Sequence, residues 1–261
     1  LGISASEVSS PASDNSPDNA PDNAIEKAYA EAYSLDCDTL IISNGELTQA
    51  LPVIEGLSIT SFSNLNDKQS KDVACGAIAS ADNLMFADLN AALLQNGVFI
   101  ELAENNTNSG LSVTAIVSKQ NTAILNSVTD IHVSDNAKLT FLKMNLDETA
   151  YRHIASTGVS LMRDARFNSY CLSLGNQLNR HDLLVKMMGA GAECDLNGIC
   201  VTTDKQHVDC HTCIEHIAPN CTSKENYRCI ADKQSQIVFN GRIHIHRDAQ
   251  KTLGSMSNKN L

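Results

Sequence analysis

The sequence predicts a mainly β protein that begins with a small α/β region. From about residue 98 to the end, short apolar runs alternate with polar residues at period two, and turn-forming residues separate the runs. No helical periodicity of useful length interrupts this stretch. Aromatic residues make up only 4% of the chain, so its core must be built from aliphatic side chains. Periodicity alone leaves two architectures open, a β-sandwich and an irregular β-solenoid.

The first 97 residues predict a different organisation from the rest. Residues 1–24 are rich in Ser, Pro, Asp and Asn, a composition that buries little apolar surface, and we expect them to be disordered. Residues 25–97 form the expected α/β region, and residues 98–261 form the β core. The elements expected before the core are a helix over 24–34, a hairpin with strands 39–43 and 46–50 around Asn44-Gly45, and a helix over 82–96 between Asp82 and Gly97.

The β core divides into short strands joined by turns. The expected strands begin with Val98–Leu102, Leu111–Ser118, Ile124–Val133, Lys138–Leu146, Gly158–Met162, Phe167–Ser173 and Asp182–Met188. The turn signals are Asn105-Asn106, Asp135-Asn136, Gly189-Gly191, Asn197-Gly198, Asp204-Lys205, Pro219-Asn220 and Asp232-Lys233. In the later strands, the side chains expected to point inward are Val208, Ile214, Ile237, Phe239, Ile243 and Ile245.

Charge and hydropathy exclude several classes of function. The formal net charge is −11, and no Lys/Arg cluster exceeds two residues, so the cationic surface that nucleic-acid binding needs is missing. An acidic surface favours protein partners. No apolar run is long enough to predict a membrane span. The chain begins with Leu1 rather than Met, so we expect a segment upstream.

Nine cysteines, an odd number without a secretion signal, predict reduced thiols in a cytoplasmic protein. We therefore expect all nine to be free. Cys210 and Cys213 form a CxxC motif, which in principle could bind zinc. In a strand, however, residues three apart point to opposite faces and cannot hold one ion. Cys213 would share its face with Glu215, and Cys210 would share the other face with His216.

The most informative polar pattern is the run from Ile243 to Asp248. In a strand, the isoleucines face one way, and His244, His246 and Asp248 face the other way, spaced about 6.6 Å apart. Imidazole and carboxylate groups can both bind iron, so these three residues are the candidate metal ligands. The alternative is a solvated polar strand face. The chain carries no phosphate-binding GxxxxGK[ST] loop, GxGxxG or GxSxG motif, so we predict neither a catalytic residue nor an enzyme.

An ordered set of motifs near the end of the chain resembles the SufD family of iron–sulfur cluster assembly scaffolds. The resemblance covers about residues 39–261 and is strongest over 206–261. Its most specific part is the run FNGRIHIHRDAQKT at 239–252, followed by MSNKNL at 256–261. The turn Phe239-Asn240-Gly241, and the lack of any Cys after Cys229, favour SufD over its paralogue SufB.

This resemblance implies a fold, a function and partners. The fold would be a right-handed β-helix over about 98–261. The function would be that of a scaffold that pairs with a SufB-like protein and joins a SufC-like ATPase, with a transient Fe–S cluster in the complex and none bound tightly by the chain alone. Family members continue past the Asn-Leu motif into a SufC-binding region, so we expect this chain to be C-terminally truncated. Its final strands would pair with SufB or, in isolation, with a second copy as a homodimer.

The resemblance also bears on the metal ligands and leaves other functions open. In some relatives a His stands where this chain has Asp248, so His246, on the same strand face, would take its place as the foremost candidate ligand. One alternative function is that of a SufB-like paralogue that holds the cluster itself. Another is a β-helical carbohydrate-active enzyme, for which the sequence shows neither a secretion signal nor an Asp/Arg-rich strand face.

Overall fold

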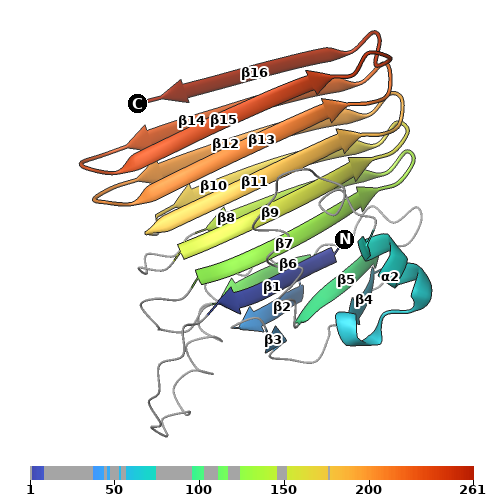
Figure 1. Ribbon diagram of the computed structural model, residues 1–261, viewed down its shortest axis with the longest axis horizontal. Helices are drawn as coiled ribbons and strands as arrows, with labels where there is room; N and C mark the ends of the chain where they lie inside the picture. Colours follow the sequence, from blue (N-terminus) through green and yellow to red (C-terminus); the bar gives the residue numbers. More distant parts are fainter. Residues whose placement is uncertain are drawn as a thin grey trace, which may run out of the picture.

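The computed structural model describes residues 2–8, 38–43, 46–47, 53, 57–74, 96–102, 111–116, 124–145, 152–175 and 177–261. Most of these residues form a β-solenoid of about five turns, in which strands stack into two facing sheets (Figure 1). The larger sheet runs, in spatial order, β15 (Gln236–Ile245), β13 (His207–His216), β11 (Leu178–Met187), β9 (Arg152–Leu161), β7 (Ile124–Val133), β1 (Gly2–Val8), β5 (Asn96–Leu102) and β4 (Leu57–Ser61).

The second sheet and the remaining elements complete the description. The second sheet runs β16 (Leu253–Asn260), β14 (Thr222–Ala231), β12 (Glu193–Thr202), β10 (Arg166–Leu174) and β8 (Lys138–Asn145). A small third sheet contains β3 (Glu46–Leu47), β2 (Asp38–Ser43) and β6 (Leu111–Ile116), and a short 3₁₀ helix, η1 (Phe62–Asn64), and a helix, α2 (Asp67–Ala74), follow β4. The mainly β fold and the choice of solenoid over sandwich are therefore confirmed.

The solenoid is held together by the stacking of like side chains on successive turns. Val159 pairs with Val185, Val185 with Ile214, and Ile214 with Ile243, so one aliphatic column runs through the interior of the larger sheet. The first three of these are fully buried, and Ile243 packs against them from the last turn. A single turn cannot enclose its own apolar face, and each turn therefore depends on its neighbours for a continuous core.

The corners of the solenoid are tight turns that adopt left-handed backbone conformations. Asn136, Asp164, Asp204 and Asn220 have φ between 56° and 60°, a region that Asn and Asp tolerate better than most residues. Backbone hydrogen bonds link equivalent corners: the Asn136 amide donates to the Arg163 carbonyl at 2.9 Å, and the Asp164 amide donates to Ala190 at 3.0 Å. The predicted turns at 135–136, 189–191, 204–205, 219–220 and 232–233 are confirmed.

The predicted turn at Asn197-Gly198 is wrong, because both residues lie inside β12. Gly198 faces the interior directly below Tyr227 of the next turn, with which it is in register. A Cβ at Gly198 would lie 2.2 Å from Cε1 of the Tyr227 ring. The glycine therefore makes room for an aromatic ring, and the Asn-Gly pair does not turn the chain.

The N-terminal part differs from expectation in two respects. Gly2–Val8 form the strand β1, which pairs antiparallel with both β5 and β7, so the expected disorder does not hold for these residues. β5 also pairs antiparallel with β4, and the parallel stack therefore begins at β7 and not at residue 98. The β2–β3 hairpin around Asn44-Gly45 is confirmed. The helix expected at 24–34, and the one expected at 82–96 apart from Asn96, lie outside the described residues.

Two strands begin earlier in the chain than predicted, and their added segments carry polar side chains that face the interior. β9 begins at Arg152 and β11 at Leu178, several residues before the apolar runs that predicted them. Two inward-facing histidines of these segments have polar partners on neighbouring turns: His153 Nε2 lies 3.0 Å from Ser127 Oγ, and His181 Nε2 lies 3.0 Å from Thr157 Oγ1. Hydrogen bonding within the core removes most of the penalty for burying them.

The predicted inward direction is confirmed for all six residues, although one of them is less buried than the others. Val208 and Ile214 are fully buried, and Ile237, Phe239 and Ile243 pack against the core from the last turn. Ile245 points inward as expected, but it is 48% exposed. It is in register with the buried His216, but β15 is the end strand of its sheet, and no further turn in the described chain covers it.

Candidate metal site

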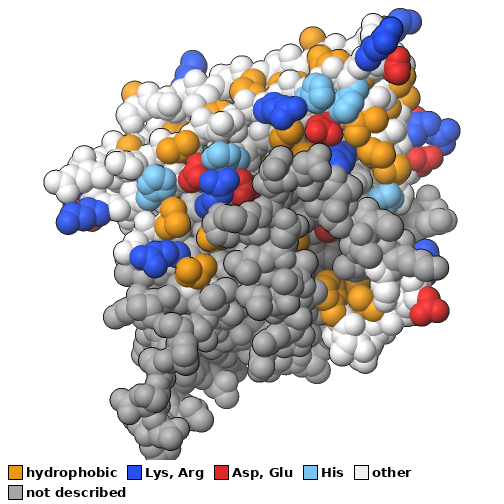
Figure 2. Space-filling model, in the orientation of Figure 1, with side chains coloured by type: hydrophobic (Ala, Val, Ile, Leu, Met, Phe, Trp, Pro, Cys, Tyr) orange, Lys and Arg blue, Asp and Glu red, His pale blue; other side chains and the backbone are white. Residues whose placement is uncertain are grey.

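The candidate site lies on the outer face of the larger sheet, where β13 and β15 end. Side chains of β13 alternate between the faces as expected: Cys210 and His216 are buried inside, whereas Cys213 and Glu215 face outward. The CxxC cysteines therefore do not converge, which confirms the argument against a zinc site at that motif. Figure 2 shows histidine side chains close to acidic ones on this face.

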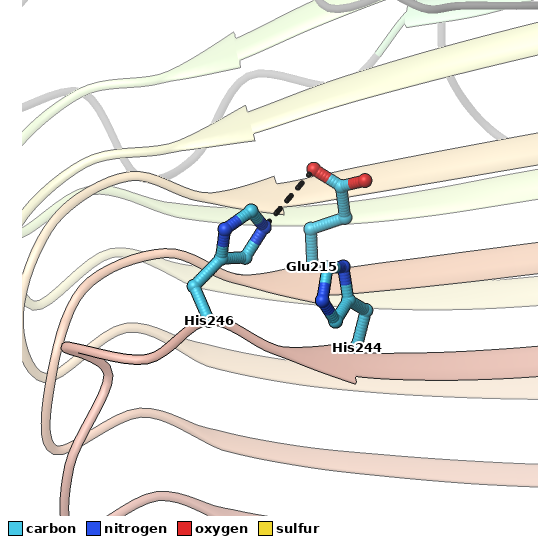
Figure 3. A group of neighbouring side chains, drawn as sticks. All are labelled: Glu215, His244 and His246. Atoms are coloured by element: carbon cyan, nitrogen blue, oxygen red, sulfur yellow. Dashed lines mark ion pairs between the residues drawn. The ribbon is translucent and has the colours of Figure 1, made fainter.

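Three outward-facing residues converge there: Glu215, His244 and His246. Glu215 and His244 occupy paired positions on the neighbouring strands β13 and β15. β15 ends at Ile245, and the amide of His246 donates a hydrogen bond of 2.9 Å to the carbonyl of His216. This bond holds the start of the turn against β13 and directs the His246 ring toward Glu215 (Figure 3).

The distances within this group are short. His246 Nε2 lies 3.6 Å from a carboxylate oxygen of Glu215, and the two imidazole centroids are 4.4 Å apart with planes at 33°. One ligand atom from each residue can be chosen so that all three lie within 4.8 Å of one another. The side chains are partly shielded, with 24% of Glu215 and 41% of His246 exposed. The arrangement presents two imidazoles and one carboxylate to a common point.

The group agrees only in part with the sequence-based candidates. The structure brings His244 and His246 together, but Asp248 is exposed and does not belong to the group. Asp248 lies beyond the end of β15, where strand alternation no longer applies. Glu215 was missed as a ligand, although its position on the outward face of β13 was correctly predicted. The sequence carries no signal for the register that places it beside His244.

Cys213 lies two residues before Glu215 on the same outward face. Partial burial, and then the negative charge of Glu215, raise the pKa of its thiol, so the protonated form dominates near neutral pH. The thiolate is the metal-binding form, so Cys213 is a poor ligand in the resting chain.

Two interior cysteines, Cys200 and Cys229, also stay protonated. Cys200 Sγ lies 3.7 Å from Cys210 Sγ, and Cys229 contacts Cys200 from the next turn. The hydrogen bond with Cys210, and then burial, raise the pKa of Cys200, and the hydrogen bond with Cys200, and then burial, raise the pKa of Cys229. The seven cysteines in the described part of the chain are free. Whether all nine are free in solution stays a prediction.

A second polar network lies on the same outer face, and its carboxylates are already paired with an arginine. The Arg180 guanidinium donates to both carboxylate oxygens of Asp182 at 2.8 and 3.0 Å and to Asp209 at 2.7 Å, and His211 lies 2.8 Å from Asp209. The hydrogen bond to Asp182 is the main reason that the pKa of Arg180 is raised. Arg180 thus neutralises much of the local negative charge, and this network offers less to a cation than the group at Glu215.

Comparison with known proteins supports one family. Residues 85–261, more than half of the chain, match the model of the SUF system FeS cluster assembly, SufBD core domain. An iron–sulfur cluster assembly SufBD family protein of Synechocystis is 26% identical over 136 residues, 52% of this chain and 30% of that protein. The iron–sulfur cluster assembly protein SufD of Escherichia coli is 29% identical over 131 residues, 50% of this chain and 31% of that protein.

A plant protein gives a similar match. The chloroplastic protein ABCI7 of Arabidopsis thaliana is 28% identical over 137 residues, 52% of this chain and 29% of that protein. The matched segments thus span about a third of the length of each of these relatives. None of the helices in the described ranges is long and apolar enough to span a bilayer. The family match includes the whole parallel solenoid that carries the site, and the chain belongs to the SufBD core-domain family of SUF iron–sulfur cluster assembly proteins.

Proposed function

We propose that this chain is a SufD-type scaffold component of SUF iron–sulfur cluster assembly, which pairs with a SufB-like scaffold and joins a SufC-like ATPase in the cytoplasm. The observation that carries the proposal is the SufBD core match over 85–261, a range that contains all the parallel strands of the solenoid. The cluster would be built transiently in the assembled complex, and the chain alone would hold none tightly. In this role the chain supplies surfaces and performs no catalysis of its own.

The two strands at which the resemblance places a partner, β15 and β16, are the last of their sheets in the described chain. The open end of the solenoid that they form carries exposed apolar side chains, among them Ile245 and Leu253, which is 63% exposed. An uncovered strand edge can accept a strand from another chain through main-chain hydrogen bonds. We propose that a SufB-like partner occupies this end and that, without a partner, a second copy does so in a two-fold arrangement.

Co-purification tests the pairing. The tagged protein would be co-expressed with SufB and SufC homologues, and bound iron and sulfide would be measured after affinity purification. A stable three-component complex that loads more iron and sulfide than the tagged protein alone is expected. Recovery of the tagged protein without either homologue would refute the proposal. A coloured cluster reconstituted on the tagged protein alone would favour the SufB-like alternative instead.

An edge variant tests the place of pairing. Ile245→Lys adds a charge at the open end and removes little buried surface, because the side chain is already 48% exposed. We expect it to weaken both the homodimer, measured by light scattering, and the SufB-like complex. Leu142→Lys is the matched control, because Leu142 is also exposed, at 43%, but lies on β8 at the other end of the stack. Equal effects of the two variants would place the interface elsewhere.

A further inference from the structure

We propose that Glu215, His244 and His246 bind one divalent first-row transition-metal ion on the outer face of the solenoid. All three ligands come from one chain. The inference therefore goes beyond the scaffold function and requires no partner. It also differs from a role for His246 alone in a cluster shared between subunits, because the site is complete without a second protein.

The first argument is geometric. Metal–ligand bonds of about 2.0–2.2 Å place neighbouring donor atoms around one ion roughly 3–3.5 Å apart. The Nε2–Oε2 distance between His246 and Glu215 is 3.6 Å, already close to this value. The remaining donor distances are at most 4.8 Å, so modest side-chain rotations bring all three donors onto one ion. β13 and the backbone hydrogen bond of His246 fix the main chain around the group.

The second argument concerns two imidazole nitrogens that have no hydrogen-bond partner in the described chain. Nδ1 of His244 and Nε2 of His246 are each shielded from solvent, and neither makes a hydrogen bond within the described chain. A shielded polar atom without a partner destabilises the folded chain, because it has lost its hydrogen bonds to water. A metal ion accepts the lone pair of a neutral imidazole nitrogen and removes this penalty. The 3.6 Å contact with Glu215 involves only the His246 ring and leaves Nδ1 of His244 without a partner in the described chain.

The third argument identifies the class of ion. Two imidazoles and one carboxylate suit Zn²⁺, Fe²⁺ and Co²⁺, whereas Ca²⁺ and Mg²⁺ prefer oxygen ligands alone. Three protein ligands on a partly exposed face leave room for water or an exogenous ligand in a further position. Lys186, next to Glu215 in the register, places a positive charge on the same face and limits affinity. We therefore expect an exchangeable ion.

Cobalt binding to the purified chain tests the site directly. Under reducing conditions, Co²⁺ is expected to bind at one equivalent and to give visible d–d absorption without a thiolate charge-transfer band. Zn²⁺ should displace Co²⁺, Fe²⁺ should compete under anaerobic conditions, and excess Mg²⁺ should not. Binding of Mg²⁺ in place of Co²⁺ would overturn the assigned class of ion.

Variants locate the ion. Loss of an outer-sphere partner alone weakens metal affinity about 10–100-fold, so Glu215→Gln should weaken Co²⁺ binding at least about tenfold. The double variant His244→Ala/His246→Ala should abolish it. Two controls should bind as the parent does: His207→Ala, an imidazole on the same outward face but outside the group, and Asp248→Asn.

Several results would overturn the site. These are retention of one equivalent of Co²⁺ by the double variant, equal loss in the His207 control, or no binding by the parent chain. Because the three side chains are partly exposed, the variants should fold, and far-ultraviolet circular dichroism would confirm it. If partners co-purify but Co²⁺ does not bind, only this inference falls. If Co²⁺ binds but no partner co-purifies, only the scaffold function falls.

Discussion

The buried histidines His153 and His181 should make the protein lose stability in acid. His153 is 9% exposed and faces the interior; burial, and then the positive charge of Lys143, lower the pKa of its ring to about 3. His181 is 4% exposed, and the same two causes hold its pKa well below 6.5. Both rings are therefore neutral in the folded chain at pH values where the unfolded chain would protonate them.

The sign and size of the effect follow from proton linkage. Between pH 6.5 and about 3, the unfolded chain binds a proton at His153 that the folded chain does not, so stability falls as pH decreases through this window. Each such histidine lowers the free energy of unfolding by about 1.4 kcal/mol for every pH unit below 6.5. The carboxyl group of Glu225 acts in the opposite sense, because burial raises its pKa and favours a protonated folded state.

Urea denaturation at a series of pH values between 4 and 7 measures this slope. The double variant His153→Gln/His181→Gln removes both titrating groups, and its stability should depend less steeply on pH than that of the parent. His207→Gln, a change on the outer face, should leave the slope unaltered. Glu225 is common to all three proteins and cancels in the comparison. Equal slopes for the parent and the double variant would refute the assignment of buried neutral histidines.

Three further predictions concern packing, an ion pair and the thiols. Gly198→Ala should lower the free energy of unfolding by about 1–3 kcal/mol, because the added Cβ meets the Tyr227 ring. Gly254→Ala is the control and should lower it less, because the nearest atom to its Cβ lies 3.2 Å away. Similar urea midpoints for the two variants would contradict this. Asp209→Asn should lower the free energy of unfolding by about 1–3 kcal/mol, because it weakens the partly buried ion pair with Arg180. A melting temperature equal to that of the parent would argue against this. Thiol titration of denatured, non-reduced protein should find nine free thiols; two or more missing would indicate a disulfide.

The open end of the solenoid shows how far strand alternation alone can predict burial. Alternation correctly placed Val208 and Ile214 inside, because their strand, β13, lies between β11 and β15. It also gave the inward direction of Ile245, but this residue is 48% exposed because its strand is the last of its sheet in the described chain. Direction is a local property of a strand, whereas burial also requires a neighbouring turn.

Local sequence patterns also could not predict which polar residues lie in the core. His153 and Thr157 interrupt the apolar run of β9, so sequence reasoning began that strand too late. Their partners, Ser127 and His181, lie on the adjacent turns. A polar residue can belong to a core when its partner lies a full turn away, and only the tertiary structure reveals that partner.

By itself, the sequence determined the alternating strands, most of the corners and the opposite directions of Cys210 and Cys213, because these depend on residues close together in the chain. It also placed His244 and His246 on one polar face. Only the tertiary structure decided that Glu215 joins them and that Asp248 does not. The physical reason is the register of the turns: stacking brings Glu215 and His244 to paired positions on neighbouring strands, and hydrogen bonding between β13 and the turn after β15 sets the place of His246.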